Sequence, residues 1–130
     1  MQIGEVAERT GLSLRTIRYY GEVGLVEPSA RSKGGFRLYT TSDVERLLLI
    51  KRMKPLEFSL EEMRDLLATL DELAAGDVDE SRHAELLARL DVFAQATEER
   101  CRVLRERIAM AEEFGGRLQA QRAKYEHPSG

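Results

Sequence analysis

The chain has 130 residues, of which 42% are hydrophobic and 33% are charged, with a formal net charge of −3. This composition fits a surface-rich helical protein and argues against a compact enzyme with a large core. No apolar run reaches the roughly 18 residues of a membrane span, so we expect no membrane partner. The N-terminus lacks the basic and apolar segments of a secretion signal, and the single Cys101 fits a reducing compartment, so we expect a cytoplasmic protein.

The charge is distributed unevenly along the sequence. Residues 1–56 contain ten Lys and Arg against six Asp and Glu, a net +4, whereas residues 57–130 contain ten against seventeen, a net −7. Because cationic surfaces bind phosphate through counterion release, the first part is the expected nucleic-acid surface. The acidic part is expected to face solvent or another protein.

Two short helices open the chain. The first is expected over residues 3–10 and ends at Gly11. Ser13 is a good N-cap for the second, over residues 14–22. Two helices joined by a short turn that contains glycine form the helix-turn-helix pattern.

A two-stranded ribbon and two further helices follow. The ribbon has its tip near Lys33 to Gly35 and its return strand over residues 36–39. Thr40 and Asp43 form a capping box that opens a third helix, which runs to the region of Pro55. A second capping box, Ser59 with Glu62, opens a fourth helix that ends near Gly76.

The remainder of the chain is predicted as a hinge over residues 77–81, one long helix over 82–118 and a polar tail over 119–130. Gly115 and Gly116 either stop this helix or weaken it. Apolar or small residues recur along it at intervals of three or four, which is typical of a coiled-coil seam: Leu86, Leu90, Phe93, Thr97, Cys101, Leu104, Ile108 and Ala111. Because a lone helix would leave this seam exposed to water, we expect a partner helix.

The second helix and the ribbon carry the residue types that hold a DNA groove. Arg15 and Thr16 lie in the first helical turn, from which side chains reach base edges, and the capping residue Ser13 is a further DNA-binding candidate. The expected phosphate and sugar contacts come from exposed cationic and aromatic side chains: Arg18, Tyr19, Arg31, Lys33, Arg37 and Tyr39. The alternative for each is a solvated charge or a packed ring. Tyr20 is a DNA-contact candidate that can equally brace the ribbon, and Phe36 and Leu38 are expected to pack the ribbon against the helix.

These motifs resemble MerR-type transcriptional regulators. The matching blocks occur in family order and spacing over residues 1–75: Ile3-Gly4-Glu5-Val6-Ala7, Gly11-Leu12-Ser13, Arg15-Thr16-Ile17-Arg18-Tyr19-Tyr20, Gly24-Leu25, Gly35-Phe36-Arg37-Leu38-Tyr39 and Phe58-Ser59-Leu60-Glu61-Glu62. Two positions depart from the family pattern, because Gly21 stands where an acidic residue is usual and Glu57 where glycine is common.

The resemblance implies an all-α fold with a small two-stranded β wing. A winged helix-turn-helix domain over residues 1–76 would be carried by a long antiparallel dimerisation helix. It also implies a homodimer that binds double-stranded promoter DNA. Family members bend and untwist an overlong promoter spacer so that RNA polymerase, an indirect partner, can engage both promoter elements.

Two alternatives to this function remain. One is a ligand- or metal-responsive sensor with an intersubunit site. Metal sensors of the family resemble each other in having a Cys at the start of the long helix and Cys or His near its end, where this chain has His83 and Gly115-Gly116. Cys101 and His83 lie about 27 Å apart along a helix, so one chain cannot join them. We therefore expect no metal or cofactor, and Cys101 is read as a small hydrophobe.

The other alternative is a coiled-coil adaptor that uses its helix-turn-helix to dock a protein, which the split in charge disfavours. The sequence has no Gly-rich phosphate loop, nucleophile elbow or paired-His motif, so we expect no enzymatic activity.

Overall fold

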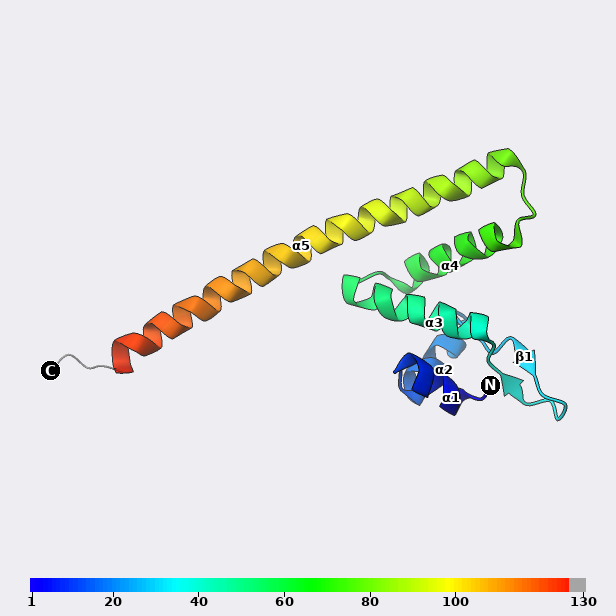
Figure 1. The fold of residues 1–130 in the computed structure, drawn as a ribbon, viewed down its shortest axis with the longest axis horizontal. Coiled ribbons are helices and arrows are strands. Elements are labelled where there is room, and N and C mark those ends of the chain that lie inside the picture. Colours follow the sequence, from blue (N-terminus) through cyan, green and yellow to red (C-terminus); the bar gives the residue numbers. More distant parts are fainter. Residues whose placement is uncertain (127–130) are drawn as a thin grey trace. The chain divides into compact units, whose positions relative to one another are not determined.

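The computed structural model describes residues 1–126, which fold almost entirely as α-helices with one two-stranded sheet (Figure 1). Two compact units are present, Met1–Leu90 and the residues from Asp91 onward. In chain order the elements are α1 (Ile3–Thr10), α2 (Leu14–Glu22), β1 (Ala30–Arg31), β2 (Arg37–Leu38), α3 (Thr41–Met53), the 3₁₀ turn η1 (Lys54–Leu56), α4 (Leu60–Ala75) and α5 (Glu80–Glu126). The predicted fold class is confirmed.

The helix-turn-helix is closed by local caps and by one contact from α3. Gly11 takes the left-handed conformation (φ +72°) and donates its N–H to Ala7 at 2.9 Å, which ends α1. The Ser13 side chain accepts the Thr16 N–H at 3.1 Å, which begins α2 as predicted. The ammonium of Lys51 donates to the Thr10 carbonyl at 2.7 Å and so fixes α3 against the end of α1.

The core of this unit lies between α1, α2, α3 and α4. Its fully buried aliphatic side chains include Val6 on α1, Ile17 on α2, and Leu47 and Ile50 on α3. Burial of such aliphatic side chains contributes about 1.5–3 kcal/mol each to folding. Because the apolar side of α2 is buried in this core, the opposite side of the helix faces solvent.

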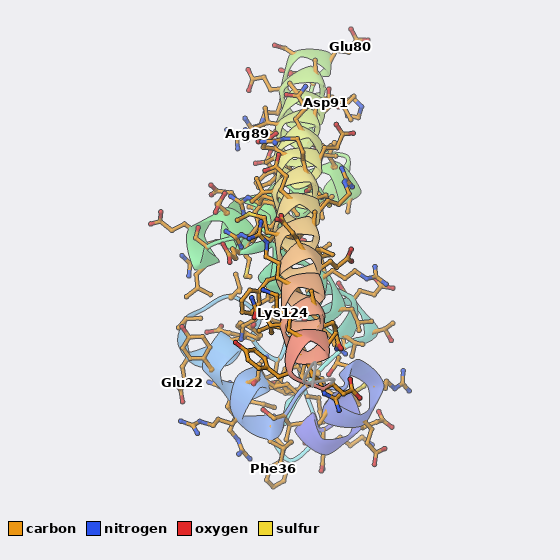
Figure 2. The ribbon with its side chains drawn as sticks, turned by 90° about the vertical axis from the view of Figure 1, so that its left-hand side faces the viewer. Glu22, Phe36, Glu80, Arg89, Asp91 and Lys124 are labelled. Carbon is orange, nitrogen blue, oxygen red and sulfur yellow. The ribbon has the colours of Figure 1, made fainter. Side chains whose placement is uncertain are left out.

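The wing is a short antiparallel ribbon that pairs Ala30 with Leu38 and Arg31 with Arg37. Its tip is closed by the Gly35 N–H, which donates to the Ser32 carbonyl at 2.9 Å. The return strand is shorter than predicted. Phe36 is also not packed between wing and helix as expected, because it is 71% exposed and projects outward from the wing (Figure 2).

Both predicted capping boxes are present, Thr40 with Asp43 on α3 and Ser59 with Glu62 on α4. Between these helices, η1 ends at Glu57, which has φ +62° and ψ +31°. This left-handed conformation favours glycine. Glu57, which stands where the family pattern commonly has glycine, therefore has a strained backbone.

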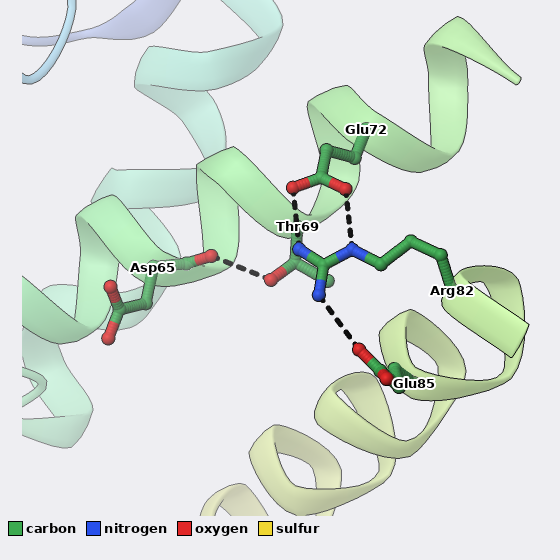
Figure 3. A network of polar contacts seen from close by, with 5 residues as sticks. All are labelled: Asp65, Thr69, Glu72, Arg82 and Glu85. Atoms are coloured by element: carbon green, nitrogen blue, oxygen red, sulfur yellow. Dashed lines mark hydrogen bonds and ion pairs between the residues drawn. The ribbon is translucent and has the colours of Figure 1, made fainter. Parts of the chain in front are cut away.

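The corner between α4 and α5 is held by Arg82 (Figure 3). Its guanidinium donates twice to the Glu72 carboxylate of α4, at 2.8 and 2.9 Å, and once to Glu85 of α5 at 2.9 Å. The Asp79 carboxylate accepts the Arg82 N–H at 2.7 Å and acts as the cap. The helix consequently begins at Glu80, and the predicted hinge over residues 77–81 is too long.

Helix α5 continues through Gly115 and Gly116 to Glu126. The expected end at residue 118 and the polar tail from 119 were therefore wrong over 119–126, where Ala, Gln, Arg and Lys are good helix formers. Residues 127–130 lie outside the described residues. Along the predicted seam, Leu86 is buried, residues from Leu90 to Leu104 are half-buried, and Ile108 and Ala111 are exposed. Every helix in residues 1–126 is too short or too polar to span a membrane.

Candidate nucleic-acid interface

The first turn of α2 presents the predicted base-reading residues. Arg15 is exposed, and no hydrogen bond or ion pair holds its guanidinium within residues 1–126. Thr16 is half-buried, and its hydroxyl accepts a hydrogen bond from the Ser13 hydroxyl at 2.9 Å. Ser13 thus serves as the cap and positions Thr16. Arg15 is therefore an exposed cation in the first turn of α2, and an arginine there can reach the O6 and N7 acceptors of guanine.

Arg18 of α2 and Arg37 of β2 converge on the same hollow. The hollow has a volume of about 640 Å³, and its lining includes Gln2, Gly21 and Phe36 besides the two arginines. Both guanidinium groups are exposed, and within residues 1–126 neither makes an ion pair. Two exposed cations from different elements at one concave surface are the arrangement that suits an anionic ligand such as a phosphate backbone.

Tyr39 lies beneath these two cations and is not an exposed contact residue. Its side chain is buried, and its backbone N–H donates to the Met1 carbonyl at 2.7 Å. Burial raises the pKa of Tyr39 and the Asp43 carboxylate raises it further, while Arg18 and Arg37 lower it, with a net pKa above the ordinary value. The phenol is therefore neutral at physiological pH, and its ring forms part of the hollow's wall.

The two tyrosines of α2 differ in position. Tyr19 is about half exposed, which leaves its hydroxyl accessible, and its ring centroid lies 5.7 Å from that of Tyr20. Tyr20 is buried, and its carbonyl accepts the N–H groups of Leu25 and Val26 at 2.9 and 3.1 Å. Burial also raises the pKa of Tyr20, with a smaller contribution from Tyr19. The bracing role is the one that this burial supports.

The wing carries two further cations that were expected to meet the backbone. Lys33 is exposed at the tip, with no hydrogen bond or ion pair within residues 1–126. Arg31 is exposed too, but its Nη1 donates to the Gly35 carbonyl at 3.1 Å, so it also stabilises the turn. Lys33 is thus the freer of the two.

Several residues that position this surface were not recognised in the sequence. Asp43 was predicted only as a helix cap, yet its Oδ2 also accepts the Ser29 N–H at 3.0 Å and the Ser29 hydroxyl at 2.8 Å. Arg64 of α4 donates to the Val23 carbonyl, just after α2, at 2.8 Å. These contacts join residues 14 and 41 positions apart, and no local pattern indicates them.

The charge state of Asp43 follows from its contacts. Burial raises the pKa of this carboxyl, but hydrogen bonds from Thr40 and Ser29 lower it by more, so the net pKa is below its ordinary value. The carboxylate is therefore ionised at physiological pH and can hold the base of the wing on α3.

Comparison with known proteins places the chain in a family. The model of MerR HTH family regulatory proteins matches residues 1–70, more than half of the chain. The chain belongs to the MerR family. Among curated relatives, the HTH-type transcriptional regulator CueR of Yersinia pestis is 34% identical over 116 residues, which cover 89% of this chain and 82% of that protein. The mercuric resistance operon regulatory protein of Bacillus cereus is 36% identical over 111 residues, covering 77% and 84%.

A third MerR-family relative matches over a shorter stretch. The HTH-type transcriptional regulator HmrR of Rhizobium leguminosarum bv. viciae is 46% identical over 72 residues. That stretch covers 55% of each protein, so the match spans about half the length of this relative.

Solved MerR-family structures share the fold. A MerR family transcriptional regulator from Listeria monocytogenes is 27% identical, with a TM-score of 0.64 over 98% of this chain and 87% of that chain. PbrR691 from Ralstonia metallidurans CH34, solved in complex with lead(II), is 27% identical with a TM-score of 0.53, covering 87% and 86%. HiNmlR, a family regulator lacking the sensor domain and bound to promoter DNA, is 23% identical with a TM-score of 0.62 over 95% and 88%, which shows the fold alone.

The two candidate metal ligands considered in the sequence, His83 and Cys101, both lie on α5. No group of three or more His, Cys, Asp or Glu side chains in residues 1–126 is placed to hold a metal ion. Cys101 is half-buried and free.

Proposed function

We propose that this MerR-family regulator acts as a cytoplasmic homodimer on double-stranded promoter DNA. One observation carries the proposal: Arg18 of α2 and Arg37 of the wing line one hollow, while Arg15 is exposed in the first turn of the same helix. In this proposal Arg15 and Thr16 contact base edges. Arg18, Tyr19, Lys33 and Arg37 contact the DNA backbone, with Arg31 in a lesser role.

The dimer would use α5 as its spacer and place two copies of α2 in successive major grooves. We further propose that binding bends and untwists an overlong promoter spacer, which brings RNA polymerase into register with both promoter elements. The cost of such deformation is of the order of 1–6 kcal/mol and would be offset by the added wing contacts.

The test separates side chains that recognise bases from side chains that bind the DNA backbone. Binding of purified protein to the DNA upstream of its own gene would be measured by fluorescence anisotropy at several salt concentrations, with molecular mass from sedimentation. Arg15→Ala is expected to cost about 1–3 kcal/mol on the preferred site and to relax base preference. Arg37→Ala is expected to weaken all sequences alike and to reduce the salt slope by about 1.

Arg105→Ala is the matched control, because it removes an exposed cation of α5 and should leave both quantities unchanged. Unchanged operator binding by Arg15→Ala would contradict the assignment of base reading. A dimer that binds no DNA at low salt would favour the adaptor function, and metal-dependent binding would favour the sensor. Circular-permutation mobility shifts on promoters of different spacer length test the bend.

A further inference from the structure

Gly21 lies in the last turn of α2, where the fold itself does not require glycine. Its backbone is helical and its φ is negative, so a residue with a side chain can adopt the same conformation. A Cβ at this position would meet only the Val26 carbonyl oxygen, at 3.7 Å, which is an ordinary van der Waals contact. Because glycine is among the poorest helix formers, alanine would be favoured here on stability alone. Neither backbone conformation nor packing within residues 1–126 therefore explains this glycine.

The surroundings of Gly21 indicate a role at the surface. It forms part of the wall of the hollow at the candidate nucleic-acid interface, together with Arg18, one turn earlier on α2, and with Phe36 and Arg37 of the wing. The Phe36 ring and both guanidinium groups are exposed. A wall of bare backbone lets a ligand approach a helix more closely than a side chain would allow. Gly21 thus leaves a place where a ligand can contact α2 itself.

The missing side chain also affects the charge of the hollow. Residues three positions apart lie side by side on a helix, so an acidic residue at position 21 could pair with Arg18. Glu22 already brings one carboxylate to the lining, against the guanidinium groups of Arg18 and Arg37. Because a second acid would neutralise the lining, glycine keeps it net positive. An anionic ligand benefits from both the space and the charge.

We propose that Gly21 is a close-approach position of the DNA interface, at which one deoxyribose-phosphate unit of the backbone contacts α2. This role depends on the DNA-binding function proposed above and specifies which part of the DNA the hollow takes. The phosphate lies between Arg18 and Arg37, and the deoxyribose lies against Gly21 and the Phe36 ring. A side chain at position 21 would move the DNA backbone outward and separate its phosphate from both cations. Gly21 thus lowers helix stability and raises DNA affinity.

Gly21→Ala tests this role because it should change stability and binding in opposite directions. The urea midpoint should rise by about 0.3 M, since alanine is the better helix former. DNA affinity should fall about three- to tenfold, since a methyl group opens a gap in contacts that act only at short range. Fluorescence anisotropy measures the loss, with the duplex upstream of the protein's own gene and with an unrelated duplex at low salt. The loss should be similar on both, because backbone contacts carry no sequence information.

Gly4→Ala is the matched control. Gly4 also lies in a helix, α1, and apart from the neighbouring backbone no heavy atom of residues 1–126 lies within 4 Å of where its Cβ would stand. Gly4 does not line the hollow. Its replacement should leave DNA affinity within about twofold and should not lower the urea midpoint. Equal losses of affinity in Gly4→Ala and Gly21→Ala would contradict a role confined to the hollow.

Gly21→Gln and Gly21→Glu separate the effect of space from the effect of charge. The two side chains have nearly the same size, so both should weaken binding by preventing the close approach. Glutamate adds a carboxylate beside Arg18, so it should weaken binding further and lower the slope of log affinity against log salt by about 1. Glutamine should leave that slope near the wild-type value. Equal affinities and slopes for the two variants would show that no phosphate lies beside Arg18 and would overturn the proposal.

The outcomes also separate the role of Gly21 from the proposed function. If the wild-type protein binds DNA and Gly21→Ala keeps full affinity, the function stands and the close approach is rejected. A lower urea midpoint in Gly21→Ala would show that packing explains the glycine, which also rejects the close approach. A wild-type protein that binds no DNA at low salt would reject the function and the close approach together.

Discussion

Ser29 and Asp43 are joined by two hydrogen bonds to a single oxygen, since Asp43 Oδ2 accepts the Ser29 N–H at 3.0 Å and the Ser29 hydroxyl at 2.8 Å. The same oxygen accepts the Thr40 N–H at 2.9 Å. One buried carboxylate therefore begins α3 and fixes the strand that enters the wing. The position of the wing relative to α3 depends on this residue.

Replacing Asp43 tests that dependence. Asp43→Ala should lower the free energy of unfolding by about 1–3 kcal/mol, because it removes the buried carboxylate that caps α3 and accepts hydrogen bonds from Ser29 and Thr40. Urea denaturation followed by circular dichroism measures the loss. Ser42→Ala, at an exposed neighbour on the same helix, is the control and should change stability by less than about 0.5 kcal/mol. An Asp43→Ala protein as stable as wild type would show that the carboxylate does not anchor the wing.

Asp43 also predicts a pH dependence. Because its folded pKa is lower than its unfolded pKa, its contribution is fully present above the unfolded value. That contribution is lost as the pH falls from the unfolded pKa through the folded pKa. The stability difference between wild type and Asp43→Asn should therefore be largest near neutral pH and shrink on acidification. Urea midpoints measured stepwise from pH 7 downward check the sign, and a difference that grows in acid contradicts the argument.

Glu57 should be improved by glycine. Its φ of +62° costs a residue with a Cβ roughly 1 kcal/mol that glycine does not incur. Glu57→Gly is expected to raise the free energy of unfolding by up to about 1 kcal/mol, as measured by thermal or urea denaturation. Glu57→Ala removes the same carboxylate but keeps the Cβ, so it should give no such gain. If Glu57→Gly and Glu57→Ala change the free energy of unfolding equally, the effect comes from loss of the carboxylate and not from relief of backbone strain.

Phe36 should contribute to DNA binding without contributing to its salt dependence. It is exposed beside Arg18 and Arg37 at the hollow, where an apolar ring can pack on a deoxyribose. Phe36→Ala should weaken DNA binding about three- to tenfold, with an unchanged slope of log affinity against log salt, since no charge is removed. Anisotropy titrations across salt concentrations measure both quantities.

Because the Phe36 ring is already exposed, Phe36→Ala should also leave the urea midpoint nearly unchanged. Full affinity in Phe36→Ala would place the ring outside the interface.

Local signals in the sequence were enough to define most elements of the first unit. Ser13, Thr40 with Asp43, and Ser59 with Glu62 begin their helices as predicted, because a cap acts within three residues. The burial of Tyr20 and Tyr39 was harder to predict, because it depends on how the helices and the wing pack together. Asp43 also accepts hydrogen bonds from Ser29, which lies 14 residues away. The local capping pattern does not indicate this contact.

The C-terminal part was harder to predict for a different reason. Glycine lowers helix propensity by about 1 kcal/mol relative to alanine, so Gly115 and Gly116 together are a strong local signal for an end. In the structure the helix continues, and the side chains on both sides of the pair keep the same heptad repeat. Propensity alone therefore placed the end too early.

The glycine pair makes the end of α5 a weakly held segment. Apart from the neighbouring backbone of α5 itself, no heavy atom of residues 1–126 lies within 4 Å of where a Cβ would stand at either glycine. The pair costs about 2 kcal/mol relative to two alanines, and the roughly ten residues beyond it are too few to form a stable helix alone. The helical conformation of these residues must then be stabilised by contacts with another molecule. Total helix content should thus rise with protein concentration, which makes circular dichroism a gauge of assembly.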